Sequence, residues 1–175
     1  MFHILQIQCT KKLADELKIK TSKEQIVDNE PLYSWHAHLF YYNRKKYCIV
    51  MNNSTRYNFI IGSLRKKEFS QFSSLVKEGI RENLLAEGFA EKVVETYLKK
   101  CDDVNYAPTS ERPIISQINE MIGATKHIQG EKGADTIDDK LNEINRFNNK
   151  FVMLTLPETY SAESMKKALI KEVLL

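Results

Sequence analysis

His36 and His38 are the two residues whose type and spacing bear most directly on chemistry. Residues 34–42 alternate as a β-strand does, so both imidazoles project from one face of that strand, about 6.5–7 Å apart. Two ligands of one transition metal can have this spacing, with Cys9, His3 or a distant carboxylate as a third ligand. Either histidine could instead act as an acid or a base, because an unperturbed imidazole titrates near neutral pH.

A structural role explains the same pair of histidines. Two imidazoles on a half-exposed strand face can simply be hydrogen-bonded to neighbours or solvated, and no third metal ligand lies at a recognisable spacing. We therefore predict no metal and no cofactor. His36, His38 and Cys9 remain the candidates for an enzymatic alternative.

A second candidate site consists of cations that could bind an anion. We call them the basic rim: Arg44, Lys45, Lys46, Arg65, Lys66 and Lys67. If residues 34–61 form three strands that run up, down and up, the turn at 44–46 and the chain leaving the third strand meet at one end of the sheet. Tyr41, Tyr42 and Tyr47 flank this end, so the rim could hold phosphate groups while aromatic rings stack on bases.

The alternative role of the basic rim is to keep the sheet soluble. Lysine-rich turns protect sheets from aggregation, and acids of the helix that begins near Arg65 could neutralise its cations. The whole chain has 26 basic and 23 acidic residues, a formal net charge of +3. So small an excess does not make nucleic acid the default partner, and only the clustering of the cations supports it.

The strand pattern predicts a mostly antiparallel sheet. Residues 2–9 alternate as an internal strand, and residues 34–42, 47–51 and 57–61 follow with short polar turns between them. Short connections favour antiparallel pairing, so we expect the last three strands to form a meander. From Lys67 onward apolar residues recur every three or four positions. Strands first and helices later indicate an α+β fold, with the sheet packed against helices.

The second half of the chain is predicted to be largely helical. Helices are expected over 69–84, 89–101, 110–123, 138–149 and from Ser161 onward, with short strands around Val104 and over 151–156. Residues 125–136 contain two glycines among charges, which is typical of a flexible connection. We therefore divide the chain into an α+β domain over 1–124 and a helical extension over 125–175. The extension packs on the same domain or, through residues 137–175, joins a second copy in a homo-oligomer.

Composition and absent motifs exclude several classes of protein. With 42% hydrophobic and 28% charged residues, the chain has the composition of a globular protein rather than a disordered or fibrous one. No apolar run reaches the roughly 20 residues of a membrane span, and no export signal is recognisable, so we expect a cytoplasmic protein without a membrane partner. The cysteines, at positions 9, 48 and 101, are too far apart for a zinc ribbon or a disulfide framework. The glycine loops of nucleotide-binding proteins and the zinc-protease and hydrolase motifs are also missing.

These observations favour a non-enzymatic binding module that contacts a nucleic acid or a protein through the basic rim. The alternative is a hydrolase- or transferase-type enzyme that uses His36 or His38 in a pocket over the face of Phe40 and Tyr42. That alternative requires both imidazoles to reach into a concave site.

Four segments resemble an uncharacterised bacterial family of small proteins that is known only as a domain of unknown function. The segments are residues 9–13 (CTKKL), 35–39 (WHAHL), 51–55 (MNNST) and the helix over 69–84. The resemblance covers roughly the first 125 residues and is weaker at Asn145 and Arg146. It implies that the CTKKL junction and the WHAH strand belong to one domain, and that some relatives are carried on plasmids or mobile elements. The family has no established activity, so it implies no functional residue.

Overall fold

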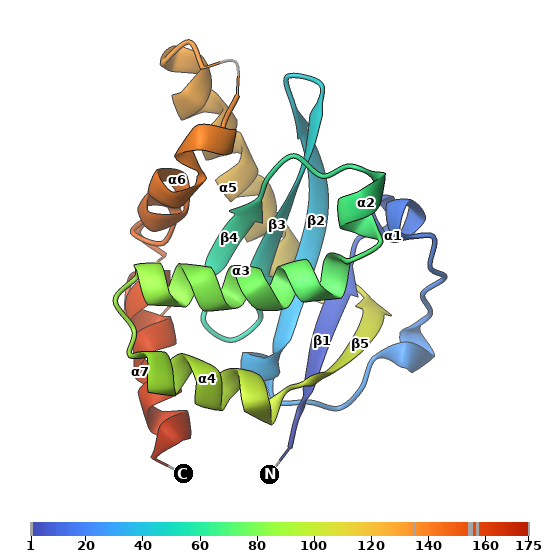
Figure 1. Cartoon of the computed structure of the whole chain (residues 1–175), viewed down its shortest axis with the longest axis vertical. Helices are drawn as coiled ribbons and strands as arrows, with labels where there is room; N and C mark the ends of the chain where they lie inside the picture. Colours follow the sequence, from blue (N-terminus) through green and yellow to red (C-terminus); the bar gives the residue numbers. More distant parts are fainter. Residues whose placement is uncertain (1, 135, 154–155, 157, 175) are drawn as a thin grey trace.

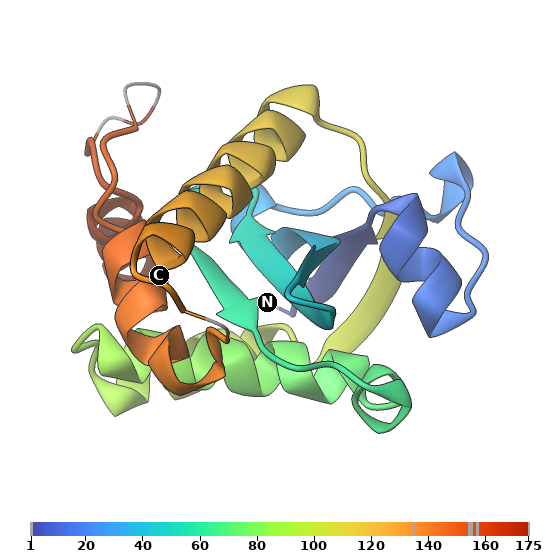
Figure 2. The ribbon, with the colours of Figure 1, turned by 90° about the horizontal axis from the view of Figure 1, so that it is seen from above.

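The computed structural model describes residues 2–134, 136–153, 156 and 158–174. Within them the chain forms a five-stranded sheet in the order β4-β3-β2-β1-β5, with helices on both faces (Figures 1 and 2). The strands are β1 (Ile4–Cys9), β2 (Ser34–Tyr42), β3 (Lys45–Asn52), β4 (Asn58–Ile61) and β5 (Asp103–Pro108). The helices are α1 (Lys11–Leu17), α2 (Lys66–Phe69), α3 (Phe72–Ala86), α4 (Glu91–Lys100), α5 (Arg112–Glu131), α6 (Leu141–Asn148) and α7 (Ser161–Val173), with 3-10 turns η1 (Lys23–Gln25), η2 (Pro31–Tyr33) and η3 (Asp138–Lys140).

The prediction of a mostly antiparallel sheet is wrong, because the sheet is mixed. Strands β2, β3 and β4 form the expected antiparallel meander. Strand β1, however, pairs parallel with β2 on one side and parallel with β5 on the other. The physical reason is the long connection between Cys9 and Ser34, in which α1, η1 and η2 carry the chain back to the end of the sheet where β1 begins. The fold class is therefore α+β with a mixed sheet.

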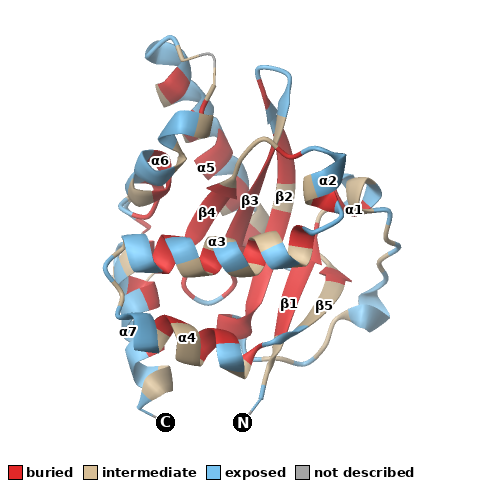
Figure 3. Cartoon of the chain, in the orientation of Figure 1, coloured by how far each residue is buried: buried red, intermediate tan, exposed pale blue. Residues whose placement is uncertain are grey.

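The side chains of β2 alternate between two separate hydrophobic cores. Trp35, Ala37 and Leu39 enter a core that includes residues of α3, α4 and α7, whereas Phe40 and Tyr42 enter a core that includes residues of α5 and α6. Figure 2 shows α3 and α5 on opposite sides of the sheet. The strands between these layers are largely buried, as Figure 3 shows. We call the two sides of the sheet the α3 face and the α5 face.

The predicted helices are present, but their ends differ. The helix expected over 69–84 is split into α2 and α3, and the helix expected over 110–123 continues to Glu131 as α5. Residues 125–131, which the sequence pattern assigned to a connection, are therefore helical. A glycine inside a helix costs only about 1 kcal/mol, and the burial of Thr125 and Gln129 favours continuation of the helix.

Two short strands were predicted outside the meander. The strand around Val104 is confirmed as β5. Residues 154 and 155 of the strand predicted over 151–156 lie outside the described residues, and its described residues form no strand.

The free edge of β4 is covered by side chains of the C-terminal segment. Because β4 is an edge strand, the backbone groups on its outer side need partners. The Asn145 side-chain oxygen accepts a hydrogen bond from the Ile60 N–H at 2.8 Å, and that of Asn149 accepts one from the Asn58 N–H at 2.9 Å. Asn149 also donates to the Asn58 carbonyl at 2.7 Å. Two amides one helical turn apart thus pair with the edge as a further strand would.

The cysteines are buried inside the fold. Cys9, Cys48 and Cys101 form no disulfide with one another. Burial raises the pKa of the Cys9 thiol to about 12, so this side chain is a poor nucleophile at neutral pH. None of the helices in the described ranges is both long and apolar enough to cross a membrane.

Candidate functional site

The β2–β3 turn carries the first half of the basic rim to one end of the molecule (Figure 1). Asn43 and Arg44 form the turn with φ angles of 45° and 67°, between the paired residues Tyr42 and Lys45. Positive φ at both positions of a two-residue loop is typical of a type I′ turn, whose twist matches that of the strands. Lys45 and Lys46, predicted in the turn, instead belong to β3.

The chain that leaves β4 carries the second half of the rim to the same place. The Leu64 N–H donates to the Lys46 carbonyl at 2.8 Å, so this segment is hydrogen-bonded beside β3. A surface hollow here is lined by Arg44, Lys45, Lys46, Ser63, Leu64 and Arg65. A neighbouring hollow is lined in part by Lys46, Arg65, Lys66 and Phe69. The two halves of the basic rim are therefore adjacent in space.

Two of the rim cations are neutralised by acids. Lys45 Nζ lies 3.0 Å from a carboxylate oxygen of Asp138, and Lys46 Nζ lies 2.5 Å from one of Glu16. No ion pair found among the described residues involves the other four cations, which are all exposed: Arg44, Arg65, Lys66 and Lys67. No acid in the described part of the chain therefore neutralises these four side chains.

Asp138 fixes the shape of this end of the sheet. Its carboxylate accepts hydrogen bonds from Ser63 Oγ at 2.7 Å and from Thr136 Oγ1 at 2.9 Å, in addition to that from Lys45. Burial alone would raise the pKa of Asp138, but the hydrogen bonds from Ser63, Lys45 and Thr136 outweigh it and lower the pKa. The ionised carboxylate thereby ties the segment after β4 to the hairpin.

An exposed aromatic ring lies beside the rim. Tyr41, at the end of β2, is 43% exposed and is paired with Lys46 across the hairpin. Lys12 Nζ lies 5.6 Å from the centre of its ring, within the range of a cation–π contact. Of the three tyrosines predicted to flank the rim, Tyr42 and Tyr47 are buried, so Tyr41 is the ring that a ligand can reach.

Sequence reasoning missed two further exposed cations, of which Lys12 lies beside Tyr41. Lys12 comes from α1 and Lys126 from α5, where its Nζ lies 5.8 Å from the centre of the Phe40 ring. Lys12 was visible in the CTKKL segment, but only the parallel pairing of β1 brings it beside Tyr41. Both lysines are exposed, and they lie at different rings of β2: Lys12 beside Tyr41, and Lys126 beside Phe40, which projects to the α5 face.

His38 lies between these two lysines. Its Nδ1 is 2.9 Å from Thr10 Oγ1, and its ring is only partly exposed. Burial lowers the pKa of His38, and the positive charges of Lys12 and Lys126 lower it further. His38 is therefore neutral at physiological pH.

His36 is completely buried, and both of its ring nitrogens are engaged. The Ser110 N–H donates to Nε2 at 3.3 Å, so the proton is on Nδ1, which lies 2.7 Å from Asn53 Oδ1. Asn53 donates in turn to Gln8, and Gln8 donates to Ser110 Oγ at 2.8 Å. These hydrogen bonds form a closed cycle through His36, Asn53, Gln8 and Ser110. Neither nitrogen of His36 is left for a metal or for proton transfer.

The structure does not bring Cys9 together with the two histidines. Cys9 belongs to the core on the α3 face, and its strand neighbour Ala37 lies in the same core. His36 and His38 project to the α5 face, as alternation along β2 requires. The sheet therefore separates the thiol from both imidazoles.

The buried histidines make folding stability depend on pH. Burial lowers the pKa of His36 despite the opposing effects of the Asn53 hydrogen bond and the Glu111 charge. Because the pKa values of His36 and His38 in the folded chain lie below the ordinary value of 6.5, their contribution to stability is complete above that pH and is lost as the pH falls below it.

We expect the unfolding free energy of the wild type to fall when the pH is lowered from about 7 to about 5. His36→Gln retains a donor and an acceptor but cannot be protonated, so the fall should be smaller in this variant. Urea unfolding at each pH measures the effect, and His127→Gln, at an exposed position of α5, is the control. Equal pH dependence in the wild type and His36→Gln would contradict the interpretation.

Comparison with known proteins identifies one family. A family model described as a domain of unknown function (DUF6933) matches residues 6–163, which includes the rim, both histidines and α6. The match extends well beyond the first 125 residues covered by the resemblance in the sequence. No curated protein and no solved structure matches the chain.

Proposed function

We propose that this chain, which belongs to the DUF6933 family of domains of unknown function, binds the phosphate backbone of single-stranded nucleic acid through the basic rim. The observation that carries the proposal is the set of four exposed cations around one end of the sheet, next to an exposed tyrosine ring. Within the described ranges these cations have no ion-pair partner. Backbone phosphates pair with the cations, and an unpaired base stacks on Tyr41.

The arrangement of charges supports nucleic acid over a generic solubility role. Acids hold Lys45 and Lys46 in place, which positions Arg44 and Arg65 on the wall of one hollow. Lys12 adds a further cation beside Tyr41, where a strand of phosphates that leaves the rim could continue. The exposed ring of Tyr41, beside cations, can stack on a base. A surface that only keeps the protein soluble needs no exposed aromatic ring.

The alternative of a hydrolase- or transferase-type enzyme has less support. His36 has no free nitrogen, and Cys9 lies across the sheet from both histidines. A cytoplasmic location and a bacterial origin, with relatives on plasmids or mobile elements, fit a nucleic-acid-binding role and belong to the same proposal. The buried, unpaired cysteines support the cytoplasmic location.

Charge reversal in the basic rim tests the proposal. The triple variant Arg44→Glu, Arg65→Glu and Lys66→Glu should weaken binding of a fluorescent single-stranded oligonucleotide by at least about 30-fold, because it removes three phosphate contacts and adds repulsion. The matched control reverses three exposed lysines on α4 and α7: Lys92, Lys99 and Lys166. Both variants have the same formal net charge, so a difference between them reports the position of the charge. Equal affinities of the two variants in fluorescence anisotropy would refute the proposal.

Tyr41 distinguishes nucleic acid from other polyanions. Tyr41→Ala should weaken oligonucleotide binding about tenfold, since base stacking on an aromatic ring is lost, and should leave retention on heparin unchanged. Tyr41→Phe keeps the ring and should bind as the wild type does. If Tyr41→Ala affected neither ligand while the rim variant affected both, the rim would bind polyanions without using the ring.

A further inference from the structure

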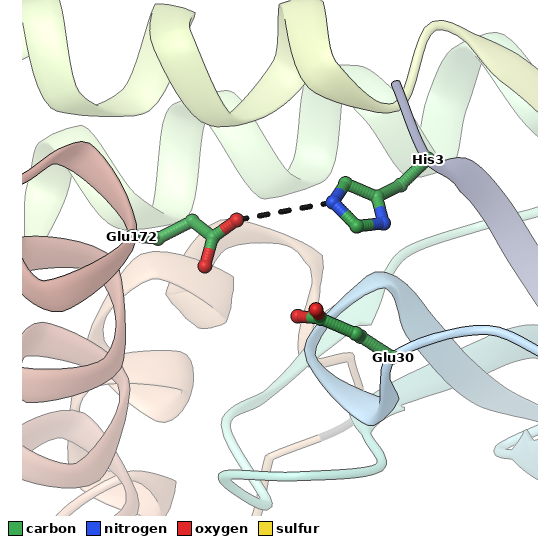
Figure 4. Close-up of side chains that lie close together, drawn as sticks. All are labelled: His3, Glu30 and Glu172. Atoms are coloured by element: carbon green, nitrogen blue, oxygen red, sulfur yellow. Dashed lines mark ion pairs between the residues drawn. The ribbon is translucent and has the colours of Figure 1, made fainter. Parts of the chain in front are cut away.

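A histidine and two glutamates from distant parts of the chain converge at the end of the molecule opposite the basic rim. His3 directly precedes β1, Glu30 directly precedes η2, and Glu172 lies in the last turn of α7. One nitrogen or oxygen of each side chain lies within 4.8 Å of those of the other two. Figure 4 shows the Glu172 carboxylate facing the His3 ring and the Glu30 carboxylate below the gap between them.

The His3 imidazole is buried and points at this gap. Its side chain is 10% exposed, and its ring stacks on Tyr33 with the ring centres 4.0 Å apart and the planes at 8°. Nε2 lies 3.9 Å from a Glu172 oxygen, too far for a hydrogen bond. In the described part of the chain no side-chain hydrogen bond to His3 is found, so the ring is held by stacking on Tyr33 and by the long contact with Glu172. A largely buried ring that faces two carboxylates, with no hydrogen bond in the described ranges between its nitrogens and a side chain, leaves room for a cation between the three groups.

The residues around Glu172 orient its carboxylate. Tyr33 Oη donates to Glu172 Oε1 at 2.6 Å, and Lys100 Nζ lies 3.5 Å from the same oxygen. Burial would raise the pKa of Glu172, but the Tyr33 hydrogen bond and the Lys100 charge outweigh it, and the pKa is lowered. Outer partners of this kind are typical of metal-ligating carboxylates. Lys100 also donates to the Glu172 main-chain carbonyl at 3.0 Å. This hydrogen bond can hold the Lys100 side chain when a metal ion replaces it at Glu172 Oε1.

We propose that His3, Glu30 and Glu172 bind a first-row divalent transition metal, with Zn²⁺ as the best fit. One imidazole and two carboxylates suit Zn²⁺, whereas Mg²⁺ and Ca²⁺ prefer oxygen ligands alone. Neighbouring ligands of tetrahedral zinc are about 3.4 Å apart, so side-chain movements of about 1 Å close the site. Glu30 is exposed and free to make that movement.

The metal would link the N-terminal strand of the chain to its C-terminal helix. It joins the start of β1 and the segment before η2 to the end of α7, and Lys100 of α4 lies beside them in the same surface hollow. Because only the folded chain brings these ligands together, the metal stabilises the fold by mass action. The site is independent of the basic rim, so its failure would leave the proposed function untouched.

Titration with Zn²⁺ alone tests the site. Isothermal titration calorimetry near pH 7.5 should show one Zn²⁺ per chain, and zinc at about 100 times its Kd should raise the unfolding midpoint by about 5–10 °C. Co²⁺ should give the visible absorption of a tetrahedral site. Absence of one-to-one binding would overturn the proposal.

Three variants assign the zinc to this site. His3→Phe keeps a ring stacked on Tyr33 but removes the ligand, and Glu30→Gln changes only an exposed side chain; each should weaken zinc binding at least about tenfold. His127→Ala removes the exposed His127–Glu131 pair on α5, where zinc could bind adventitiously, and should bind as the wild type does. Unchanged binding in His3→Phe and Glu30→Gln, or loss of binding in His127→Ala, would refute the assignment.

Discussion

Replacing Asn149 by alanine is expected to lower the free energy of unfolding by about 3–4 kcal/mol. Asn149 is fully buried, and its side-chain oxygen accepts hydrogen bonds from the Asn58 N–H at 2.9 Å and from Ser161 Oγ at 2.8 Å. Its amide donates to the carbonyls of Asn58 and Asn145, both at 2.7 Å. Alanine leaves these buried groups without partners, and each unsatisfied group costs about 1–3 kcal/mol before relaxation.

Asn142→Ala is the matched control for Asn149→Ala. Asn142 lies in the first turn of α6, the helix that Asn149 directly follows, but it is exposed and accepts only one hydrogen bond, from Arg146, among those found in the described residues. Its replacement should change stability by no more than about 0.5 kcal/mol. Urea unfolding followed by circular dichroism measures both variants. If the two variants were equally stable, the pairing of Asn149 with the edge of β4 would not hold the C-terminal segment in place.

Arg146→Met is expected to destabilise the fold by about 3–4 kcal/mol, because it leaves Glu87 as an unpaired, buried charge. Arg146 Nε lies 2.7 Å from Glu87 Oε1, and the Glu87 side chain is only 8% exposed. The same guanidinium donates to Asn83 Oδ1 at 2.6 Å and to Tyr57 Oη at 3.2 Å. The contacts join α6 to α3 and to the segment before β4.

Two further variants separate charge burial from other effects. Arg81→Met breaks the more exposed pairs with Glu78 and Glu95 and should cost no more than about 1 kcal/mol. Adding Glu87→Gln to Arg146→Met should recover part of the loss, since no buried charge is then unpaired. A cost for Arg146→Met as small as that for Arg81→Met would contradict the burial argument.

Local patterns were sufficient to predict the meander and most helices. The alternation from Trp35 to Tyr42 correctly separated the α3 face from the α5 face, and the antiparallel pairing of β2, β3 and β4 follows from short connections. The parallel pairing of β1 could not be predicted in this way. It depends on where a long connection returns the chain, and no local pattern records that direction.

The same limit applies to the candidate sites. The two groups of rim residues lie before and after the short β3–β4 hairpin, so the antiparallel topology was enough to predict that they meet. Their binding role stays a prediction. Lys12 and Lys126 approach the rim through the parallel β1 and through α5, which sequence periodicity does not place. His3, Glu30 and Glu172 share no spacing motif at all. Only the packing of α7 beside α4 and the position of β1 bring them together.

The assignment of residues 125–175 to the same domain also remains a prediction. The hydrogen bonds of Asn145, Arg146 and Asn149 with the meander and α3 favour it. The Asn149→Ala and Arg146→Met variants bear on this assignment directly, because they should destabilise the whole fold in one cooperative transition if the segment is part of it.

The salt dependence of oligonucleotide binding shows whether the cations of the basic rim contact phosphates. If the four exposed rim cations Arg44, Arg65, Lys66 and Lys67 contact phosphates, the logarithm of the binding constant should fall against the logarithm of the salt concentration with a slope of about −3 for the wild type. In the variant with Arg44, Arg65 and Lys66 changed to glutamate, the slope should shrink to about −1 or binding should vanish. A wild-type slope near zero, or the same slope in the rim variant, would show that the basic rim does not bind the nucleic-acid backbone.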